Sequence, residues 1–81
     1  MRPLTDQEIS ALQSQGNSAE DWGAVFIAEG ADISGIWDCH FAGHVSLGKG
    51  CRLRQVRWVD NYEIGDEVTL FNIGRLVSDG D

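Results

Sequence analysis

A four-residue apolar pattern occurs three times in the chain, and each copy begins seventeen residues after the one before it. The copies are Ile36–Cys39, Leu53–Val56 and Leu70–Ile73. A second pattern has the same period, because Leu47-Gly48 is followed seventeen residues later by Ile64-Gly65. Two patterns with one period predict that the chain coils, and that residues seventeen apart lie above one another.

The large apolar residues divide one repeat into three sides of five, six and six residues. Because side chains alternate along a strand, the residue two places before each large apolar residue should also face inward. The predicted inward residues are Cys39, Phe41, Val45, Leu47, Cys51, Leu53, Val56, Trp58, Tyr62, Ile64, Val68, Leu70 and Ile73. This spacing excludes one amphipathic helix. It predicts a parallel β-helix, a triangular prism of about 2.5 coils of 17 residues.

The register also predicts which side chains stack between coils. Phe41 should lie against Trp58 inside the prism. Outside it, the same spacing predicts one column of Trp37, Arg54 and Phe71 at a short corner, and beside it a ladder of Asp38, Gln55 and Asn72. The Arg54 guanidinium would then lie between two aromatic rings, where a cation–π contact contributes about 0.5–1 kcal/mol.

The pattern ends at Arg75, which stands where an inward residue is expected. Leu76 follows it, so the last coil either frays or contains one inserted residue.

Residues 1–16 have the pattern of an α-helix. Thr5 stands three places before Glu8, which is the spacing of a capping box, and Gly16 supplies a left-handed C-terminal residue. We expect residues 1–23 to form a helical cap and residues 24–81 to form the β-helix coils.

The 81 residues carry a formal net charge of −7, which disfavours nucleic acid and anionic membranes as partners. The basic residues are nonetheless concentrated, because four of the six fall within nine positions: Lys49, Arg52, Arg54 and Arg57. Two interpretations remain open for this run. It is either a solvated surface balanced by neighbouring acids or a local anion-binding patch.

Compartment and cofactors are inferred from what the sequence lacks. It contains no secretory signal pattern and no stretch approaching the ~20 apolar residues of a membrane span, so we expect a cytoplasmic protein without membrane partners. Cys39 and Cys51 are then expected to be reduced thiols that act as small core residues. Without a C-x2-C pair, no metal site or other cofactor is predicted.

Three ordered blocks carry a family resemblance. They are Arg2-Pro3-Leu4-Thr5 continuing to Asp21-Trp22, Phe41 to Gly48, and Val59 to Asp66. In these blocks the chain resembles the start of an uncharacterised family of long bacterial hexapeptide-repeat proteins. The resemblance implies a left-handed β-helix that is acyltransferase-like in architecture, and it transfers no functional residue.

The two histidines, His40 and His44, are the candidate catalytic residues. By resemblance of fold, hexapeptide acyltransferases use a histidine base at a coil edge between subunits, where it must reach the acceptor. The alternative is that both are ordinary exposed histidines. A metal site like that of trimeric β-helical carbonic anhydrases would need three histidines.

Two functions follow from the sequence. A β-helix is open at its ends, unpaired strand edges invite association, and this chain has fewer than the ~3 repeats that stability requires. The first hypothesis is therefore an assembly or scaffolding module, either a homo-oligomer (a trimer or an end-to-end association) or one joined to further coils of a longer chain. The alternative is an acyltransferase-like or nucleotide-sugar-linked transferase, or a fragment of one, with a histidine base at a subunit interface.

Overall fold

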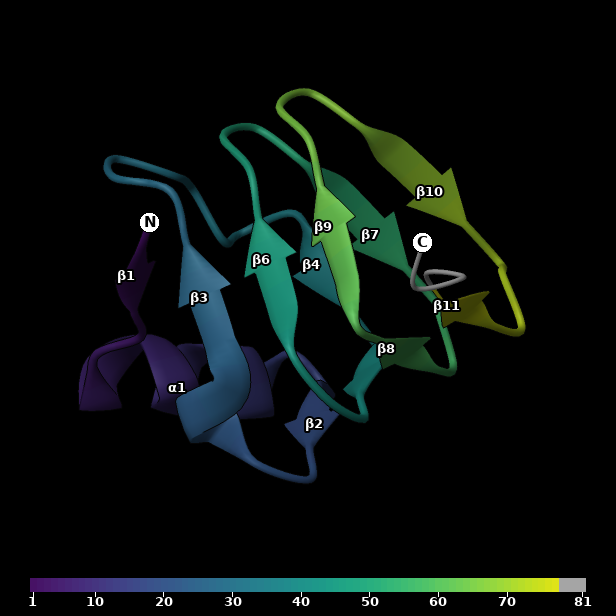
Figure 1. The fold of residues 1–81 in the computed structure, drawn as a ribbon, viewed down its shortest axis with the longest axis horizontal. Coiled ribbons are helices and arrows are strands. Elements are labelled where there is room, and N and C mark those ends of the chain that lie inside the picture. The colour runs from purple at the N-terminus through teal and green to yellow at the C-terminus, as the bar shows by residue number, and fades with distance from the viewer. Residues whose placement is uncertain (78–81) are drawn as a thin grey trace.

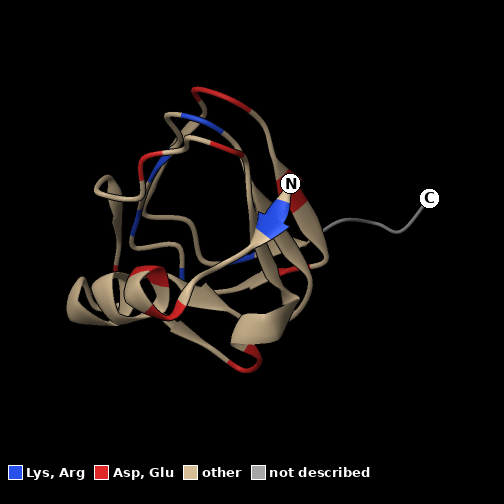
Figure 2. Ribbon diagram, turned by 90° about the vertical axis from the view of Figure 1, so that its left-hand side faces the viewer, with Lys and Arg blue, Asp and Glu red and all other residues tan. Residues whose placement is uncertain are grey.

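Short parallel strands stacked in three sheets form the protein, with one helix at the start (Figure 1). The structure is a computed structural model, and it describes residues 1–77. In the turned view of Figure 2 the coils overlie one another in a roughly three-sided outline. The architecture is a parallel β-helix, or β-solenoid, as the seventeen-residue period predicts.

Each sheet forms one side of the outline. Sheet A contains, in spatial order, β1 (Arg2–Pro3), β3 (Val25–Ile27), β6 (Val45–Leu47) and β9 (Tyr62–Ile64). Sheet B contains β2 (Ser18–Ala19), β5 (His40–Phe41), β8 (Val59–Asp60) and β11 (Leu76–Val77). Sheet C contains β4 (Ile36–Trp37), β7 (Arg52–Arg54) and β10 (Thr69–Phe71). All pairings are parallel except that of β1 with β3.

Helix α1 (Asp6–Ser14) begins at the predicted capping box. The Glu8 backbone N–H donates to the Thr5 hydroxyl at 3.2 Å, and the Glu8 carboxylate accepts from the Thr5 backbone N–H at 2.9 Å. These two bonds satisfy donors that the first turn of a helix otherwise leaves unpaired. A short 3₁₀ helix (Trp22–Ala24) then leads into β3.

The core is the row of inward side chains that the period predicts. Ile36 pairs in register with Leu53 and Leu53 with Leu70, while Val45 pairs with Tyr62 and Leu47 with Ile64. The side chains with at most 2% of their surface exposed are Leu12, Val25, Ile27, Ile36, Cys39, Phe41, Val45, Leu47, Cys51, Leu53, Val56, Val59 and Ile64. Helix α1 contributes Leu12 to this core, so it covers the first coil.

One predicted inward residue is wrong. Phe41 pairs with Val59, eighteen residues on, and Val59 is fully buried while Trp58 is only half-buried. Trp58 instead packs against the His40 ring, with centroids 5.6 Å apart. A shift of one residue exchanges the two faces of a strand, so the extra residue before Val59 turns Trp58 out of the core.

The sequence pattern predicted this irregularity at Arg75, one coil after its actual position. Leu76 pairs with Val59, so Arg75 corresponds to Trp58 and both coils share the shifted register. The next corner restores the seventeen-residue period. Tyr62 follows Val59 by three residues, whereas Val45 follows Phe41 by four. Asn61 makes this shorter turn with a φ of 49°.

A column of left-handed residues turns the chain between sheets C and B. Asp38, Gln55 and Asn72 have φ values of 56°, 58° and 56°, and each follows one residue of the in-register column Trp37, Arg54 and Phe71. The Gln55 and Asn72 N–H groups donate to the coil before, to Trp37 O at 3.0 Å and Arg54 O at 2.9 Å. The residue at the end of α1 takes the place of a preceding coil for Asp38. The Asp38 N–H donates to Gln15 O at 3.2 Å.

Asn17 fastens the helix to the first coil. Its side chain is buried, and its Nδ2 group donates to Leu12 O at 2.9 Å and to Ile36 O at 2.8 Å. Its Oδ1 atom accepts from the Cys39 N–H at 3.0 Å. Both the Nδ2 group and the Oδ1 atom are thus bonded, which lowers the cost of burying this polar side chain.

The predicted division into a cap of residues 1–23 and coils of residues 24–81 remains a prediction. Strand β2 lies inside the cap range yet pairs with β5, so cap and coils share sheet B. Residues 78–81, the last part of the predicted coil range, lie outside the described residues.

Candidate functional site

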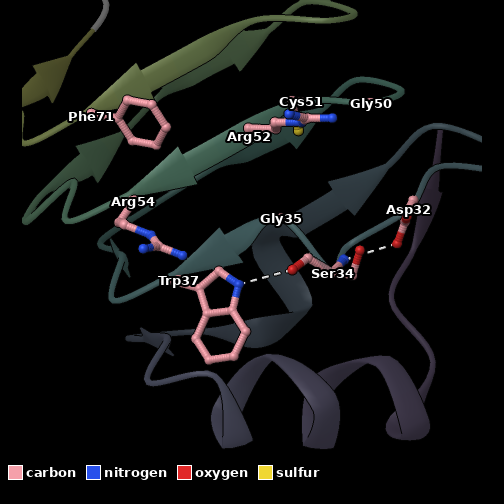
Figure 3. Close-up of a pocket in the computed structure, with 9 residues that line it drawn as sticks. All are labelled: Asp32, Ser34, Gly35, Trp37, Gly50, Cys51, Arg52, Arg54 and Phe71. Carbon is pink, nitrogen blue, oxygen red and sulfur yellow. Dashed lines mark hydrogen bonds between the residues drawn. The ribbon is translucent and has the colours of Figure 1, made fainter.

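An open groove of about 730 Å³ lies over the outer face of sheet C (Figure 3). The loop that leads into β4 and the turn that leads into β7 form its wall. Its lining residues are Asp32, Ser34, Gly35, Trp37, Gly50, Cys51, Arg52, Arg54 and Phe71. Figure 2 shows Lys and Arg positions on this side of the outline, away from β1. The groove thus combines aromatic surface with positive charge.

The predicted column of Trp37, Arg54 and Phe71 runs along the groove. Arg54 pairs in register with both aromatic residues, which confirms the column, although it lies on the strands of sheet C and not at a corner. Both rings are open to solvent, with 39% of Trp37 and 59% of Phe71 exposed. Figure 3 shows the Arg54 side chain on the rung between the rings, with its guanidinium directed toward Trp37.

Trp37 is held in place by the loop before it. Its indole Nε1–H donates to the Ser34 backbone O at 2.8 Å. Ser34 is itself part of a turn in which its N–H donates to Asp32 Oδ1 at 2.9 Å. These bonds fix one aromatic wall of the groove.

Arg52 lies beside the column and projects to the same side as Arg54, because residues two apart on a strand share a face. A Cβ atom on Gly35 would lie 3.2 Å from the Arg52 Cγ, so the glycine leaves room for the arginine stem. Within residues 1–77, no carboxylate lies within ion-pair distance of either arginine. Their guanidinium groups therefore retain donors for a ligand.

Asp32 is the acidic member of the groove. The hydrogen bond from the Ser34 backbone N–H lowers the pKa of this carboxyl, which is therefore ionised at neutral pH. The groove carries two positive charges and one negative charge.

The structure divides the predicted anion-binding run. Arg52 and Arg54 meet in the groove, whereas Lys49 and Arg57 do not line it. Lys49 lies at the turn between β6 and β7, where its backbone N–H donates to Asp66 Oδ1 at 2.8 Å. The clustering of basic residues along the sequence could not predict that Asp32 lines the groove, because the loop before β4 lies outside the repeat.

His40, one candidate base, is half-buried on sheet B. Its Nδ1 atom is 2.8 Å from the Ser18 hydroxyl, and its Nε2 atom is 4.0 Å from Glu20 Oε1. The Ser18 hydroxyl and the Trp58 ring thus hold the imidazole from two directions.

His44, the other candidate base, is exposed at the corner before β6 and packs its ring against Phe26 at 5.2 Å. Neither His40 nor His44 lines the groove with the arginines. The described part of the chain contains no group of three or more His, Cys, Asp or Glu residues that is arranged to hold a metal ion. A catalytic part for either histidine remains a prediction.

Both cysteines are free and buried, as predicted. Burial raises the pKa of Cys39 to about 11 and raises that of Cys51. The Cys39 thiol also donates to the Trp37 backbone O at 3.2 Å. Since the thiolate is the reactive form, burial disfavours nucleophilic chemistry at both residues.

Among residues 1–77, no helix has the length and apolar content that crossing a membrane requires.

The comparisons with known proteins give one match. A family model described as a domain of unknown function, DUF4954, matches residues 1–74, which is most of the chain. No curated protein matches the chain, and no solved structure does.

Proposed function

The chain belongs to the DUF4954 family, and we propose that it acts as an assembly module whose last coil pairs end to end with a second copy. The observation that supports this most is the incomplete burial of the last coil. Its inward residues Val68, Leu70, Ile73 and Leu76 are only half-buried. The residues that precede them by seventeen, Cys51, Leu53, Val56 and Val59, are at most 2% exposed.

The proposal keeps the finer fold assignment, a left-handed β-helix of the hexapeptide-repeat type. The close stacking of Gly48 over Gly65 supports it, because a Cβ atom on Gly48 would meet the backbone of Gly65 and Asp66 at 2.5–2.7 Å. Glycine at this corner is part of the repeat pattern that carries the resemblance. The expected compartment remains the cytoplasm of a bacterium.

The strand edges at this end are available for pairing. Within residues 1–77, β9, β11 and β10 are each the outermost strand of their sheet. Val68 O accepts from the Arg52 N–H at 2.8 Å, and the Asn72 N–H donates to Arg54 O at 2.9 Å. These residues flank β10, so the even-numbered positions in and beside this strand bond to β7. By alternation, the backbone groups of Thr69 and Phe71 point to the open edge.

An exposed apolar side chain accompanies these edges. Val77, on β11, is 36% exposed. Exposed apolar residues on unpaired strands are what association covers.

The opposite end of the stack is closed. Strand β1 pairs antiparallel with β3, and α1 contributes Leu12 to the core beneath the first coil. The antiparallel pairing of β1 shows that an edge of this solenoid accepts a strand of reversed direction. If two copies pair through this end of residues 1–77, a two-fold axis would give a closed dimer and not a fibre.

The experiment removes one donor from the open edge. Proline at position 69 lacks the N–H and blocks the edge, yet it leaves intact the bonds from β10 to β7. We expect light scattering to give a dimer for the wild type and for Thr69→Ala at on the order of 100 μM, and a monomer for Thr69→Pro.

Hydrogen exchange provides a second measurement on the wild type. The Thr69 and Phe71 amides should be protected at high protein concentration and should exchange rapidly after dilution, even if Thr69→Pro does not fold. A wild-type monomer at the highest concentration, or a dimer that survives in folded Thr69→Pro, would contradict the end-to-end pairing.

The second candidate function is the acyltransferase-like or nucleotide-sugar-linked transferase. It is favoured by His40, whose hydrogen bond with Ser18 orients the ring while its Nε2 atom is farther than hydrogen-bond distance from Glu20. This candidate needs a neighbouring subunit against sheet B, because β5 lies within the stack and not at its end. A trimer in the light-scattering experiment would favour it and contradict the dimer.

A further inference from the structure

We propose that the groove over sheet C binds a small ligand in which a flat aromatic ring is joined to one anionic group, as in a mononucleotide. This inference does not depend on the assembly proposed above. It rests on three properties of the groove: two arginines without acidic partners in the described chain, two exposed rings on the same face, and a volume suited to a small molecule.

Arg52 and Arg54 supply the anion site. They project from one strand to the same side, and within residues 1–77 neither is in an ion pair. A guanidinium group presents a planar fork of N–H donors that matches phosphate and carboxylate oxygens. Gly35 lies against the stem of Arg52, which a side chain at that position would crowd.

Trp37 and Phe71 supply the ring site. They lie two rungs apart in register, with Arg54 between them, which places their positions roughly 10 Å from one another. A flat ring of any base can stack on an exposed aromatic side chain. The bond from the Trp37 indole to Ser34 holds one stacking surface ready before the ligand arrives.

Size and charge favour a small molecule over a nucleic acid chain. The groove volume of about 730 Å³ is within the range of small-molecule sites, roughly 300–1,000 Å³. The net charge of −7 repels a polyanion, and ionised Asp32 limits the positive charge of the groove to one. A single phosphate or carboxylate beside a ring fits this balance.

The test follows the Trp37 indole N–H signal by NMR, assigned with Trp37→Phe, while 5′-AMP is added to the full chain. Adenosine, inorganic phosphate and benzoate form separate arms. They test the ring alone, the anion alone and a carboxylate in place of the phosphate. We expect 5′-AMP to bind at least about tenfold more tightly than either adenosine or phosphate, because both halves of the site contribute. Saturation by benzoate at lower concentration than by 5′-AMP would identify the anion as a carboxylate and support the same ring-plus-anion chemistry.

Matched variants locate the binding. The double substitution Arg52→Gln and Arg54→Gln should weaken 5′-AMP binding by about tenfold or more, while Arg57→Gln, outside the groove, should leave it unchanged. Asp32→Asn preserves the acceptor for Ser34 and removes the negative charge, so it should tighten binding about two- to threefold.

Three results would overturn the proposal. They are no shift of the Trp37 signal with any of the four compounds, equal affinity for phosphate and 5′-AMP, and equal weakening by Arg57→Gln and by the groove substitutions. The second would mean that the rings take no part, and the third that the binding is only attraction to net positive charge.

Discussion

Phe41 stacks on Val59, eighteen residues further along the chain, and this one-residue departure from the period decides which side chains of the second coil enter the core. Trp58, the residue at the regular spacing, lies half-buried against His40. Arg75 occupies the corresponding place one coil later, since Leu76 pairs with Val59.

This pairing predicts that two adjacent positions differ in their tolerance of a charged substitution. Val59→Arg places a charge in the core and should prevent folding. Trp58→Arg should fold, with a loss of less than about 2 kcal/mol in the free energy of unfolding, because Arg75 occupies the equivalent place. Urea unfolding followed by circular dichroism measures both, and the reverse order of stability would refute the observed register.

The stacked corner glycines give a second prediction. Gly48→Ala should lower the free energy of unfolding by about 2 kcal/mol or more, because its Cβ would overlap the backbone of Gly65 and Asp66. Gly65→Ala is the matched control. Its Cβ would meet only Val68 Cγ2 at 3.8 Å, so stability should change by less than about 1 kcal/mol. Equal losses in thermal or urea unfolding would show that the corners do not stack as described.

Asn17 should be costly to replace. Asn17→Ala leaves the buried Cys39 N–H without its acceptor and Ile36 O without this amide donor, and we expect a loss of about 2–3 kcal/mol in the free energy of unfolding. The exposed residue Gln13 gives the control, since Gln13→Ala should change stability by less than about 0.5 kcal/mol. A similar effect of both substitutions in urea unfolding would mean that the helix is not fastened through Asn17.

The Arg2–Glu8 pair should make the free energy of unfolding depend on pH in the acidic range. Hydrogen bonds from Arg2 and from the Thr5 backbone lower the pKa of Glu8 to about 2, below its ordinary value of 4.5. The unfolded chain therefore takes up this proton first as pH falls. The contribution is present in full above pH 4.5 and is lost between 4.5 and about 2.

Glu8→Gln isolates that contribution, because glutamine still completes a capping box. The wild type should be more stable than the variant by about 1 kcal/mol at neutral pH, and the two should converge as the pH falls from 4.5 towards 2. Urea unfolding at a series of pH values measures the difference. A difference that stays constant over this range would contradict the assigned pKa.

The burial of both thiols predicts that they react slowly with thiol reagents. Cys39 and Cys51 are each 2% exposed and have raised pKa values, so a thiol reagent such as Ellman's reagent should react with them only as the chain opens. Their reaction rates should rise together with added urea. Rapid reaction of one thiol in the absence of urea would mean that this part of the core is open.

The repeat period predicted most of the fold. It identified the inward rows through Ile36, Leu53 and Leu70 and the outer column of Trp37, Arg54 and Phe71, because stacked coils repeat the same environment at the same interval. The helix start at Thr5 was predictable for another reason, since a capping box is a local interaction over four residues.

The candidate site was predictable only in part. Charge density identified Arg52 and Arg54 but grouped them with Lys49 and Arg57, which the coil carries away from the groove. The wall that completes the groove comes from the loop before β4, where neither period nor local pattern constrains the chain.

The sequence by itself thus determined the period, the stacked columns and the start of the cap, because these depend on spacing and on neighbours along the chain. Only the tertiary structure decided between Trp58 and Val59, and only it showed that Asn17 and the end of α1 complete the first coil. Both residues at 58 and 59 are apolar, so side-chain pattern cannot separate them. The choice depends on how many residues each corner uses, and backbone pairing with the neighbouring coil sets that number.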